Sequence, residues 1–150
     1  MAMLALAFRA GPMRLALPIA AVVEVSPRRA LRPLALAPAG VLGLLPFRGT
    51  LTPVVDLCRI LLGRDCRPLR SSRIIVVRLS GNAADRLIGL LAEDVLDLLP
   101  VTATIPGLRL PSAPWLSDHL ADQRDLPQLL DPVALLPDEL EALFVAEAAS

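Results

Sequence analysis

Fifteen prolines are spread along the 150 residues of this chain, and they restrict its fold more than any other feature. A proline inside a helix removes a backbone hydrogen bond and clashes with the preceding turn. Before residue 137, no helical pattern continues for more than about a dozen residues without a break. Short apolar segments separated by Pro, Gly and Ser are typical of strands and turns. The sequence therefore predicts a mainly β protein built from small barrels.

Three parts of the chain carry the clearest patterns of secondary structure. Leu4–Arg9 and Met13–Ile19 flank a Gly-Pro turn pair and predict an opening hairpin. The apolar, β-branched interior of Arg73–Leu79 predicts a strand that is buried on both faces. Leu57–Leu62 has the length of a one- or two-turn helix, and it ends at Gly63, a residue favoured at helix C-termini.

The second half of the chain has less regular patterns. Arg86–Ala92 and Val95–Leu99 predict one long bent strand or two shorter ones. Leu126–Leu136 predicts a strand followed by a turn of helix that Pro132 opens. Pro137–Ala149 has acidic residues in its first turn and one apolar face, and it is the best helix of the sequence.

The charges divide the chain into a basic and an acidic part, although the net charge is zero. Residues 1–80 contain 12 arginines and 3 acidic residues, a balance of +9, whereas residues 81–150 contain 3 arginines and 12 acidic residues, a balance of −9. Two explanations remain open. The two parts neutralise each other within the molecule, or they present patches of opposite sign to different partners.

Residues suited to catalysis or metal binding are scarce. The chain has one histidine, His119, two cysteines, Cys58 and Cys66, and no Lys or Tyr. A Cys–His nucleophile would need thiol and imidazole within hydrogen-bond reach. A zinc site from these three residues lacks the short paired spacing of zinc ligands, and the sequence has no serine-hydrolase or phosphate-binding motif. We therefore expect no enzymatic activity, no metal and no cofactor.

Glu93, Asp94 and Asp97 form an acidic cluster that we considered as a metal site. On a strand, Glu93 and Asp97 share one face and Asp94 lies on the other. Three carboxylates in this arrangement are typical of a solvated edge, and we expect them to lie on one.

Nucleic acids and membranes are poor candidates as partners. Four aromatic residues offer almost no stacking platform for bases. The cluster Arg28, Arg29 and Arg32 is explained either by an acidic protein partner or by a solvated loop. The longest uncharged stretch, Pro33–Phe47, holds three prolines and is too short to span a bilayer. We expect a chain in a reducing cytoplasm that has no cleaved signal peptide and does not cross the membrane.

The most specific segment of the sequence is Val41–Gly63. Gly43 and Gly49 are predicted to bracket a tightly turning loop, and Arg48, beside Gly49, is predicted to expose its guanidinium at the rim. From the residues alone, two roles for Arg48 remain open: contact with a partner, or a local bond to loop carbonyls or to an acid such as Glu24.

This segment resembles the CheW-like domain family of bacterial chemosensory systems. The matching residues are Val41, Gly43, Leu44, Arg48, Gly49, Pro53, Val54, Asp56, Leu57, Leu62 and Gly63. Flanking features follow in the order that the family shows: Val22 and Glu24, Pro33, an apolar strand at 73–77, and segments at 89–95 and 129–136. The resemblance covers about residues 4–136.

The resemblance implies one domain over residues 1–150, with two five-stranded SH3-like barrels around a shared core. One barrel would hold residues 20–70, and the other would hold residues 1–19 and 71–136, followed by a C-terminal helix over residues 137–150. It also implies a stand-alone, non-enzymatic adaptor that joins chemoreceptor tips at the inner membrane to the regulatory domain of a CheA-type histidine kinase, without a cofactor.

Particular residues receive expected roles from the resemblance. The family's receptor-binding face lies at or near the positions of Val22, Glu24, Gly43 and Arg48. Structural roles are expected for Gly49, Pro53, Asp56, Leu57 and Gly63, with the Asp56 carboxylate capping the following helix. The chain departs from the family at Glu93 and Asp94, where an Asp followed by a Gly or another small residue is usual. The family's turn geometry is therefore not carried over to these two residues.

A function from a different class also fits these patterns. A small β-barrel of a signalling pathway can hold an apolar molecule in the groove between its two parts. A deep, enclosed apolar pocket would favour such a ligand-binding module, whereas a shallow open groove would favour the adaptor.

Overall fold

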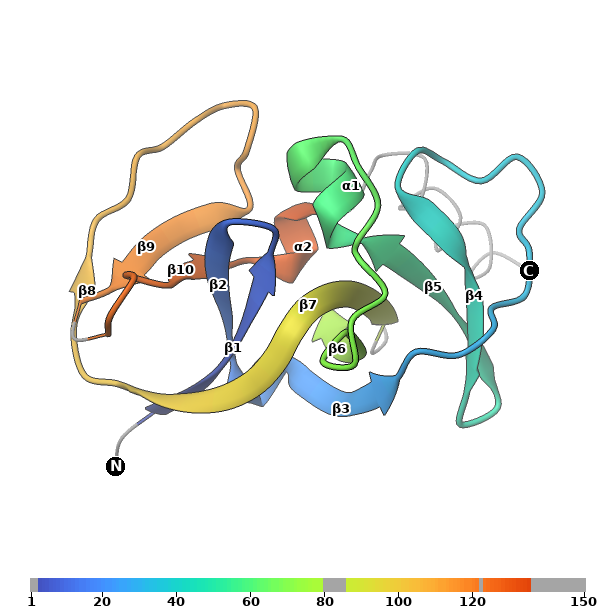
Figure 1. Ribbon diagram of the computed structural model, residues 1–150, viewed down its shortest axis with the longest axis horizontal. Coiled ribbons are helices and arrows are strands. Elements are labelled where there is room, and N and C mark those ends of the chain that lie inside the picture. Colours follow the sequence, from blue (N-terminus) through green and yellow to red (C-terminus); the bar gives the residue numbers. More distant parts are fainter. Residues whose placement is uncertain (1–2, 80–85, 122, 136–150) are drawn as a thin grey trace.

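The computed structural model describes residues 3–79, 86–121 and 123–135 (Figure 1). Its elements in chain order are β1 (Met3–Ala10), β2 (Met13–Pro18), the 3₁₀ helix η1 (Ile19–Ala21), β3 (Val22–Pro27), β4 (Val41–Phe47), β5 (Thr50–Asp56), α1 (Leu57–Leu62), β6 (Arg73–Leu79), β7 (Arg86–Val101), β8 (Thr104–Ile105), β9 (Leu116–Leu120), β10 (Gln128–Leu130) and α2 (Pro132–Leu135). The predicted mainly β fold class is confirmed.

The local predictions for the opening hairpin and the first helix are confirmed. β1 and β2 pair antiparallel, with Phe8 opposite Leu15, and Gly11 adopts the left-handed conformation in the turn between them. α1 spans Leu57–Leu62, as predicted, and Gly63 ends it with a φ of 73°. Glycine is favoured there because a left-handed residue with a side chain is strained.

Strand β7 belongs to both sheets of the molecule (Figure 1). Its first part pairs with β6 and β5, up to Ala92 opposite Arg73. Its second part pairs with β1, from Glu93 opposite Arg9. The register of this second pairing shifts between Glu93 and Asp97, and Asp94 in this stretch has a φ of +48°. The predicted long bent strand is therefore a single strand with a bulge, and the bulge redirects it from one sheet to the other.

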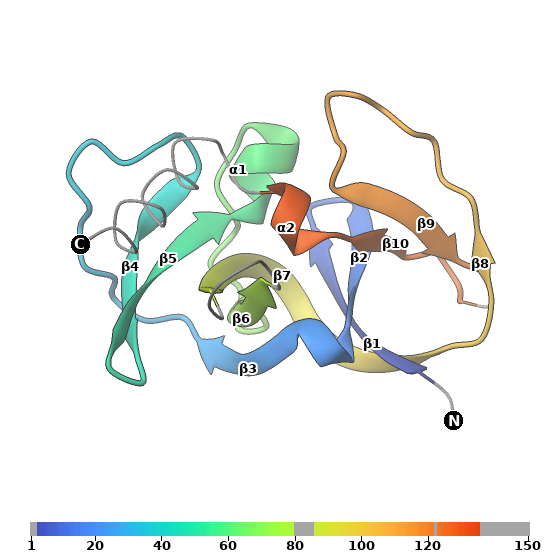
Figure 2. The ribbon, with the colours of Figure 1, turned by 180° about the vertical axis from the view of Figure 1, so that it is seen from behind.

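The strand pairing places β6 beside β3 (Figure 2), in the sheet that also holds β4, β5 and the first part of β7. The other sheet holds β1, β2, β8, β9, β10 and the second part of β7. β6 and residues 86–92 of β7 thus pair with strands that lie within residues 22–56, and residues 93–101 of β7 pair with β1. The division into two barrels at residue 70 stays a prediction.

One hydrophobic core joins the two sheets. Phe8 and Leu15 from the β1–β2 hairpin belong to the same buried cluster as Val55 and Leu90 from the other sheet. The four β-branched residues Ile74–Val77 are at most 2% exposed, which confirms that this strand is buried on both faces. Burial of such side chains contributes most of the favourable free energy of folding.

The segment Val41–Phe47 is a strand, so the loop predicted between Gly43 and Gly49 is wrong. Its residues alternate between buried and more exposed positions and pair with β5 over its length. Only Arg48 and Gly49 form the turn. Glycine is common in loops, but Gly43 lies at a bulge inside a strand, and the local sequence pattern does not distinguish these two cases.

The end of the chain is described only to residue 135. The strand and short helix predicted over Leu126–Leu136 correspond to β10 and α2, which begins at Pro132. The helix predicted over residues 137–150 lies outside the described residues. No helix in the described part of the chain has the length and apolar character that a membrane span requires.

Candidate functional site

The β4–β5 hairpin brings Arg48 close to Glu24 of β3. Arg48 and Gly49 have φ angles of 48° and 80°, as in the two-residue turns that suit the twist of a hairpin. The Arg48 guanidinium lies 3.9 Å from Glu24 Oε1 and 4.8 Å from the centre of the Phe47 ring. The side chains are 67% and 45% exposed, so both charges are open to a partner.

Gly43 lies on β4 of the same hairpin, where it packs against the chain that follows β3. Arg32 and Leu44 exchange two backbone hydrogen bonds of 2.8 Å, which hold the chain after β3 against β4. Gly43 has a φ of +152°, and a Cβ atom there would lie 2.6 Å from the Arg32 carbonyl oxygen. A glycine is therefore needed for the close approach of the two segments. Val22 is half-buried and packs against the core. Of the four residues expected at the receptor-binding face, Glu24 and Arg48 are the two with charged side chains, and both are exposed.

The residues expected to be structural have local roles in this part of the fold. Asp56 is buried and caps α1, because its Oδ1 accepts a hydrogen bond from the Arg59 amide at 3.1 Å. Leu57 is fully buried at the start of α1, and Pro53 is buried opposite Leu44.

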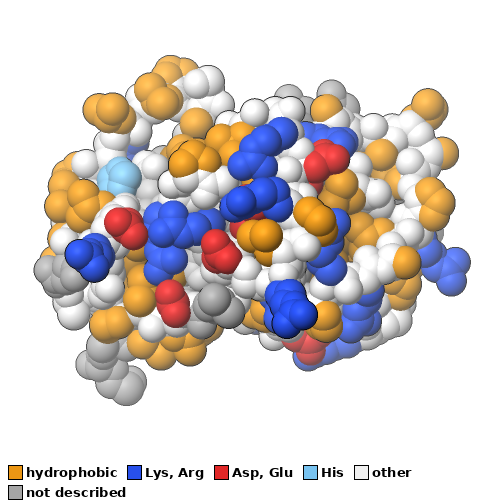
Figure 3. Space-filling model, viewed as in Figure 1, with side chains coloured by type: hydrophobic (Ala, Val, Ile, Leu, Met, Phe, Trp, Pro, Cys, Tyr) orange, Lys and Arg blue, Asp and Glu red, His pale blue; other side chains and the backbone are white. Residues whose placement is uncertain are grey.

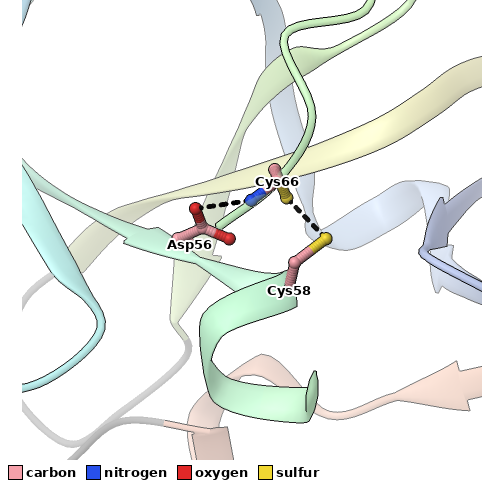
Figure 4. A group of neighbouring side chains, drawn as sticks. All are labelled: Asp56, Cys58 and Cys66. Atoms are coloured by element: carbon pink, nitrogen blue, oxygen red, sulfur yellow. Dashed lines mark hydrogen bonds between the residues drawn. The ribbon is translucent and has the colours of Figure 1, made fainter. Parts of the chain in front are cut away.

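A second group of titratable side chains lies in the core, where α1, the connection between α1 and β6, and β7 meet. The Cys66 thiol contacts the Cys58 sulfur at 2.8 Å, and the Cys66 amide donates to Asp56 Oδ2 at 3.0 Å (Figure 4). The Cys58 thiol donates to Glu93 Oε1 at 3.2 Å. All four side chains are buried. We call Asp56, Cys58, Cys66 and Glu93 the thiol–carboxylate cluster.

Glu93 is fully buried, so the prediction of a solvated edge is wrong for this residue. Its carboxylate accepts hydrogen bonds from the Gly11 amide at 2.8 Å and from Arg67 Nε at 2.7 Å, as well as from Cys58. Burial acts to raise the pKa of Glu93, but these donors, Arg67 first, outweigh it and lower the pKa to about 2. Glu93 therefore stays ionised inside the protein.

The other two carboxylates of the predicted acidic cluster have different surroundings. Asp94 accepts a hydrogen bond from the Ser71 hydroxyl at 2.6 Å, and the exposed Asp97 pairs with Arg14 at 3.1 Å. The bulge at Asp94 separates the three side chains. Each carboxylate thus has its own partners, whereas strand spacing alone places Glu93 and Asp97 on one face.

His119 lies on β9, where its Nδ1 is 2.8 Å from the Leu126 carbonyl oxygen. Within the described residues, neither thiol is within hydrogen-bond distance of His119. The fold thus brings together Cys58 and Cys66, which are eight residues apart, but joins them to Asp56 and Glu93 and not to His119. Burial raises the pKa of the Cys58 thiol to about 11 and also raises that of Cys66, which is opposite to the change that a nucleophilic cysteine requires.

Ion pairs between described residues connect the basic and acidic parts of the sequence. They join Arg9 to Asp125, Arg14 to Asp97 and Arg67 to Glu93. Arginine and acidic side chains are accordingly intermixed across one face of the molecule (Figure 3). The cluster Arg28, Arg29 and Arg32 is exposed after β3. Part of the charge asymmetry is therefore neutralised within the molecule, and exposed arginines remain.

Two hollows lie beside the proline-rich segment that precedes β9. One has a volume of about 330 Å³, and Arg109, Leu110 and Leu116 contribute to its walls. The other has a volume of about 240 Å³, and its walls include Met13, His119 and Leu110. Neither hollow is fully enclosed.

Known proteins share the sequence pattern and the fold. Residues 4–139 match the CheW-like domain family. Protein FrzA of Myxococcus xanthus is 35% identical over 97 residues, which cover 62% of this chain and 61% of FrzA. Chemotaxis protein CheW of Rhizobium meliloti (strain 1021) is 34% identical over 97 residues, which cover 65% of this chain and 60% of that protein. The match thus spans about three fifths of the length of these curated relatives.

A solved structure has the same architecture. The crystal structure of scaffolding protein TtCheW from Thermoanaerobacter tengcongensis superposes with a TM-score of 0.79 at 19% sequence identity. The superposition covers 91% of this chain and 89% of that chain. The two chains therefore share the arrangement of strands described above.

Proposed function

This chain belongs to the CheW-like domain family, and on that premise we propose that it is a non-enzymatic adaptor that couples chemoreceptors to a CheA-type histidine kinase. The names of two relatives, FrzA and chemotaxis protein CheW, and the scaffolding role named for TtCheW support this proposal. An adaptor acts by holding two partners at a high effective concentration, so it needs neither a catalytic group nor a cofactor. Such a protein works in the cytoplasm, at receptor arrays on the inner membrane.

The observation that carries the proposal is the exposed pair of Glu24 and Arg48. Both residues stand at positions that the family resemblance assigns to the receptor-binding face. The two-residue turn at Arg48 and the close packing at Gly43 constrain the backbone of the hairpin that carries Arg48. A charged pair that is exposed and held on a rigid hairpin suits recognition of a polar receptor surface.

A binding assay between this chain and the cytoplasmic tip of its receptor tests the assigned face. We expect Arg48→Glu to weaken receptor binding by at least roughly tenfold, because it places two negative charges together where the partner meets a cation and an anion. Arg109→Glu is a matched control: Arg109 is 64% exposed, compared with 67% for Arg48, and it also pairs with a carboxylate, that of Asp118. If Arg48→Glu binds the receptor as well as the parent chain, the assigned face is wrong.

The adaptor role itself is tested with both partners present. Size-exclusion chromatography of this chain with the regulatory domain of the kinase and a receptor tip fragment should yield a ternary complex. Binding to the kinase domain alone would indicate a divergent pathway or a competing inhibitor. Failure to bind either partner would contradict the adaptor proposal.

The alternative of a ligand-binding module has less support. Neither of the two hollows described above, both lined by described residues, is fully enclosed, whereas a site for an apolar molecule buries most of its ligand's surface. They also lie beside the segment before β9, away from Glu24 and Arg48. We therefore propose the adaptor alone.

A further inference from the structure

The adaptor role leaves the thiol–carboxylate cluster without a function. Cys58 lies in the first turn of α1, and Cys66 lies in the connection between α1 and β6. Their sulfur atoms are 2.8 Å apart (Figure 4), and a disulfide bond brings two sulfurs to about 2.05 Å. A movement of less than about 1 Å, shared between two side chains, would join them. We propose that Cys58 and Cys66 are a covalent modification site, at which a reversible intramolecular disulfide forms. This proposal does not rest on the adaptor role.

The surrounding hydrogen bonds favour a disulfide over a metal ion. The donor atoms of Asp56, Cys58 and Cys66 lie within 4.8 Å of one another, which is also compatible with a metal site. Both Asp56 oxygens, however, already accept backbone hydrogen bonds, from the amides of Arg59 and Cys66. Two thiolates on a tetrahedral zinc ion are held roughly 3.8 Å apart, so zinc would force the sulfurs apart and compete for the carboxylates. A disulfide leaves the Asp56 bonds in place.

Charge balance also favours a disulfide at this position. Two neutral thiols become one neutral disulfide, so no charge is added to a core that already holds Glu93 and Asp56. Two hydrogen bonds are lost, because a disulfide sulfur carries no hydrogen to donate: the one from the Cys58 thiol to Glu93 and the one from the Cys66 thiol to the Leu91 carbonyl oxygen, at 3.4 Å. Glu93 keeps its bonds from the Gly11 amide and from Arg67.

The reaction is a thiol–disulfide exchange with a low-molecular-weight disulfide, such as oxidised glutathione. One cysteine thiolate attacks the small disulfide and releases its first thiol. The second cysteine then attacks the mixed disulfide and releases the second thiol. The two cysteines lose two protons and two electrons, and the small disulfide gains both to become two thiols.

Burial makes this exchange slow without preventing it. The raised pKa of Cys58, about 11, leaves little thiolate near neutral pH, and Cys58 is fully buried. The disulfide should therefore form at the rate at which the connection between α1 and β6 opens locally and exposes the thiols. The measurement must reach equilibrium from both the oxidised and the reduced side.

The decisive experiment compares the folded chain with the same chain in urea. Both are equilibrated in mixtures of reduced and oxidised glutathione, and the free thiols are then counted after quenching. Because the chain has only two cysteines, this count is unambiguous. We expect the folded chain to keep its disulfide at concentrations of reduced glutathione at least roughly tenfold higher than those that reduce the unfolded chain. If the folded chain keeps both thiols in a mixture that oxidises the unfolded chain, the proposal is wrong.

Peptide mapping shows where the bond lies. Arg59 and Arg64 stand between the two cysteines, so trypsin releases Cys58 and Cys66 in separate peptides. The oxidised chain should be a monomer that is lighter by two hydrogen atoms, and these two peptides should stay joined until a reductant is added. Cross-linked dimers or glutathione adducts alone would overturn the proposal.

Single substitutions and a metal titration complete the test. Neither Cys66→Ser nor Cys58→Ser should give the joined peptides, and their remaining thiol should exchange only to mixed disulfides. Zn²⁺ is titrated into the reduced parent chain and into both variants. One-to-one binding of Zn²⁺ that both substitutions abolish would identify a metal site and overturn the disulfide proposal.

Discussion

Glu93 and Asp97 lie four residues apart on β7, yet their surroundings differ in kind. Asp97 faces solvent and pairs with Arg14, whereas Glu93 is enclosed by donors from the β1–β2 turn, α1 and the connection to β6. Exposed ion pairs contribute little to stability, because water screens them. A buried carboxylate with several donors is different, because removing its charge leaves those donors without a partner.

Glu93 predicts a dependence of stability on pH. Its pKa is about 2 in the folded chain and 4.5 ordinarily. The stabilisation from ionised Glu93 is therefore complete above about pH 5 and is lost as the pH falls through 4.5 towards 2, by up to roughly 3 kcal/mol. We expect Glu93→Gln to lower the free energy of unfolding in urea at pH 7 by about 2–4 kcal/mol. The stability of this variant should no longer show the loss between pH 4.5 and 2 that protonation of Glu93 causes.

Asp97→Asn is the matched control for Glu93→Gln, because it changes a carboxylate to an amide on the same strand. We expect it to lower the free energy of unfolding by less than about 1 kcal/mol. Urea unfolding at several pH values measures both variants. Equal effects of the two substitutions would show that burial of Glu93 has no energetic consequence.

At the scale of the element, the bulge at Asp94 determines how β7 serves two sheets. Asp94 adopts a φ of +48°, and its carboxylate is hydrogen-bonded to Ser71. The Val95 amide also donates to the Ser71 carbonyl, at 3.1 Å, so the bulge is tied to the segment before β6. An aspartate tolerates the left-handed conformation better than most residues with a side chain, which is how this chain does without the small residue usual in the family.

Two neutral substitutions of Asp94 separate backbone strain from charge. Asparagine keeps an oxygen for Ser71 and tolerates a positive φ, whereas a β-branched valine does neither. We expect Asp94→Val to lower the free energy of unfolding by about 2–3 kcal/mol and Asp94→Asn by less than about 1 kcal/mol, as measured in urea. Similar losses for both variants would mean that charge, and not backbone conformation, matters at this position.

The elements that could be predicted are those whose signal lies in residues next to one another in the sequence. The β-branched run in Arg73–Leu79 and the terminal glycine of α1 needed no distant partner to be recognised. The β4 strand was missed because Gly43 serves a contact with Arg32, which no local pattern shows. Likewise, the spacing of Cys58 and Cys66 gave no signal, since their contact depends on the path of the connection after α1. The exposure of Arg48 was predicted, and its proximity to Glu24 was named as one of two possibilities.

For the whole molecule, the ion pairs between the basic and acidic parts of the sequence predict a modest response to salt. In the pairs of Arg9 with Asp125 and Arg14 with Asp97 the carboxylate is exposed, whereas Glu93, the partner of Arg67, is buried, and salt screens the exposed pairs. We expect the free energy of unfolding in urea to fall by less than about 2 kcal/mol between about 0.05 and 1 M NaCl. A fall of more than about 4 kcal/mol would mean that attraction between the two parts is a main source of stability.

The strand that both sheets share also determines where this chain tolerates interruption. A reporter inserted into β7, or a split placed there, would break the hydrogen bonding of both sheets at once, so neither half of the molecule is an independent folding unit. The connection between β3 and β4 offers a better position, because Leu36 is fully exposed there. A probe at that position would lie on the connection that Gly43 and Arg32 anchor, and it would leave the strand pairing of both sheets uninterrupted.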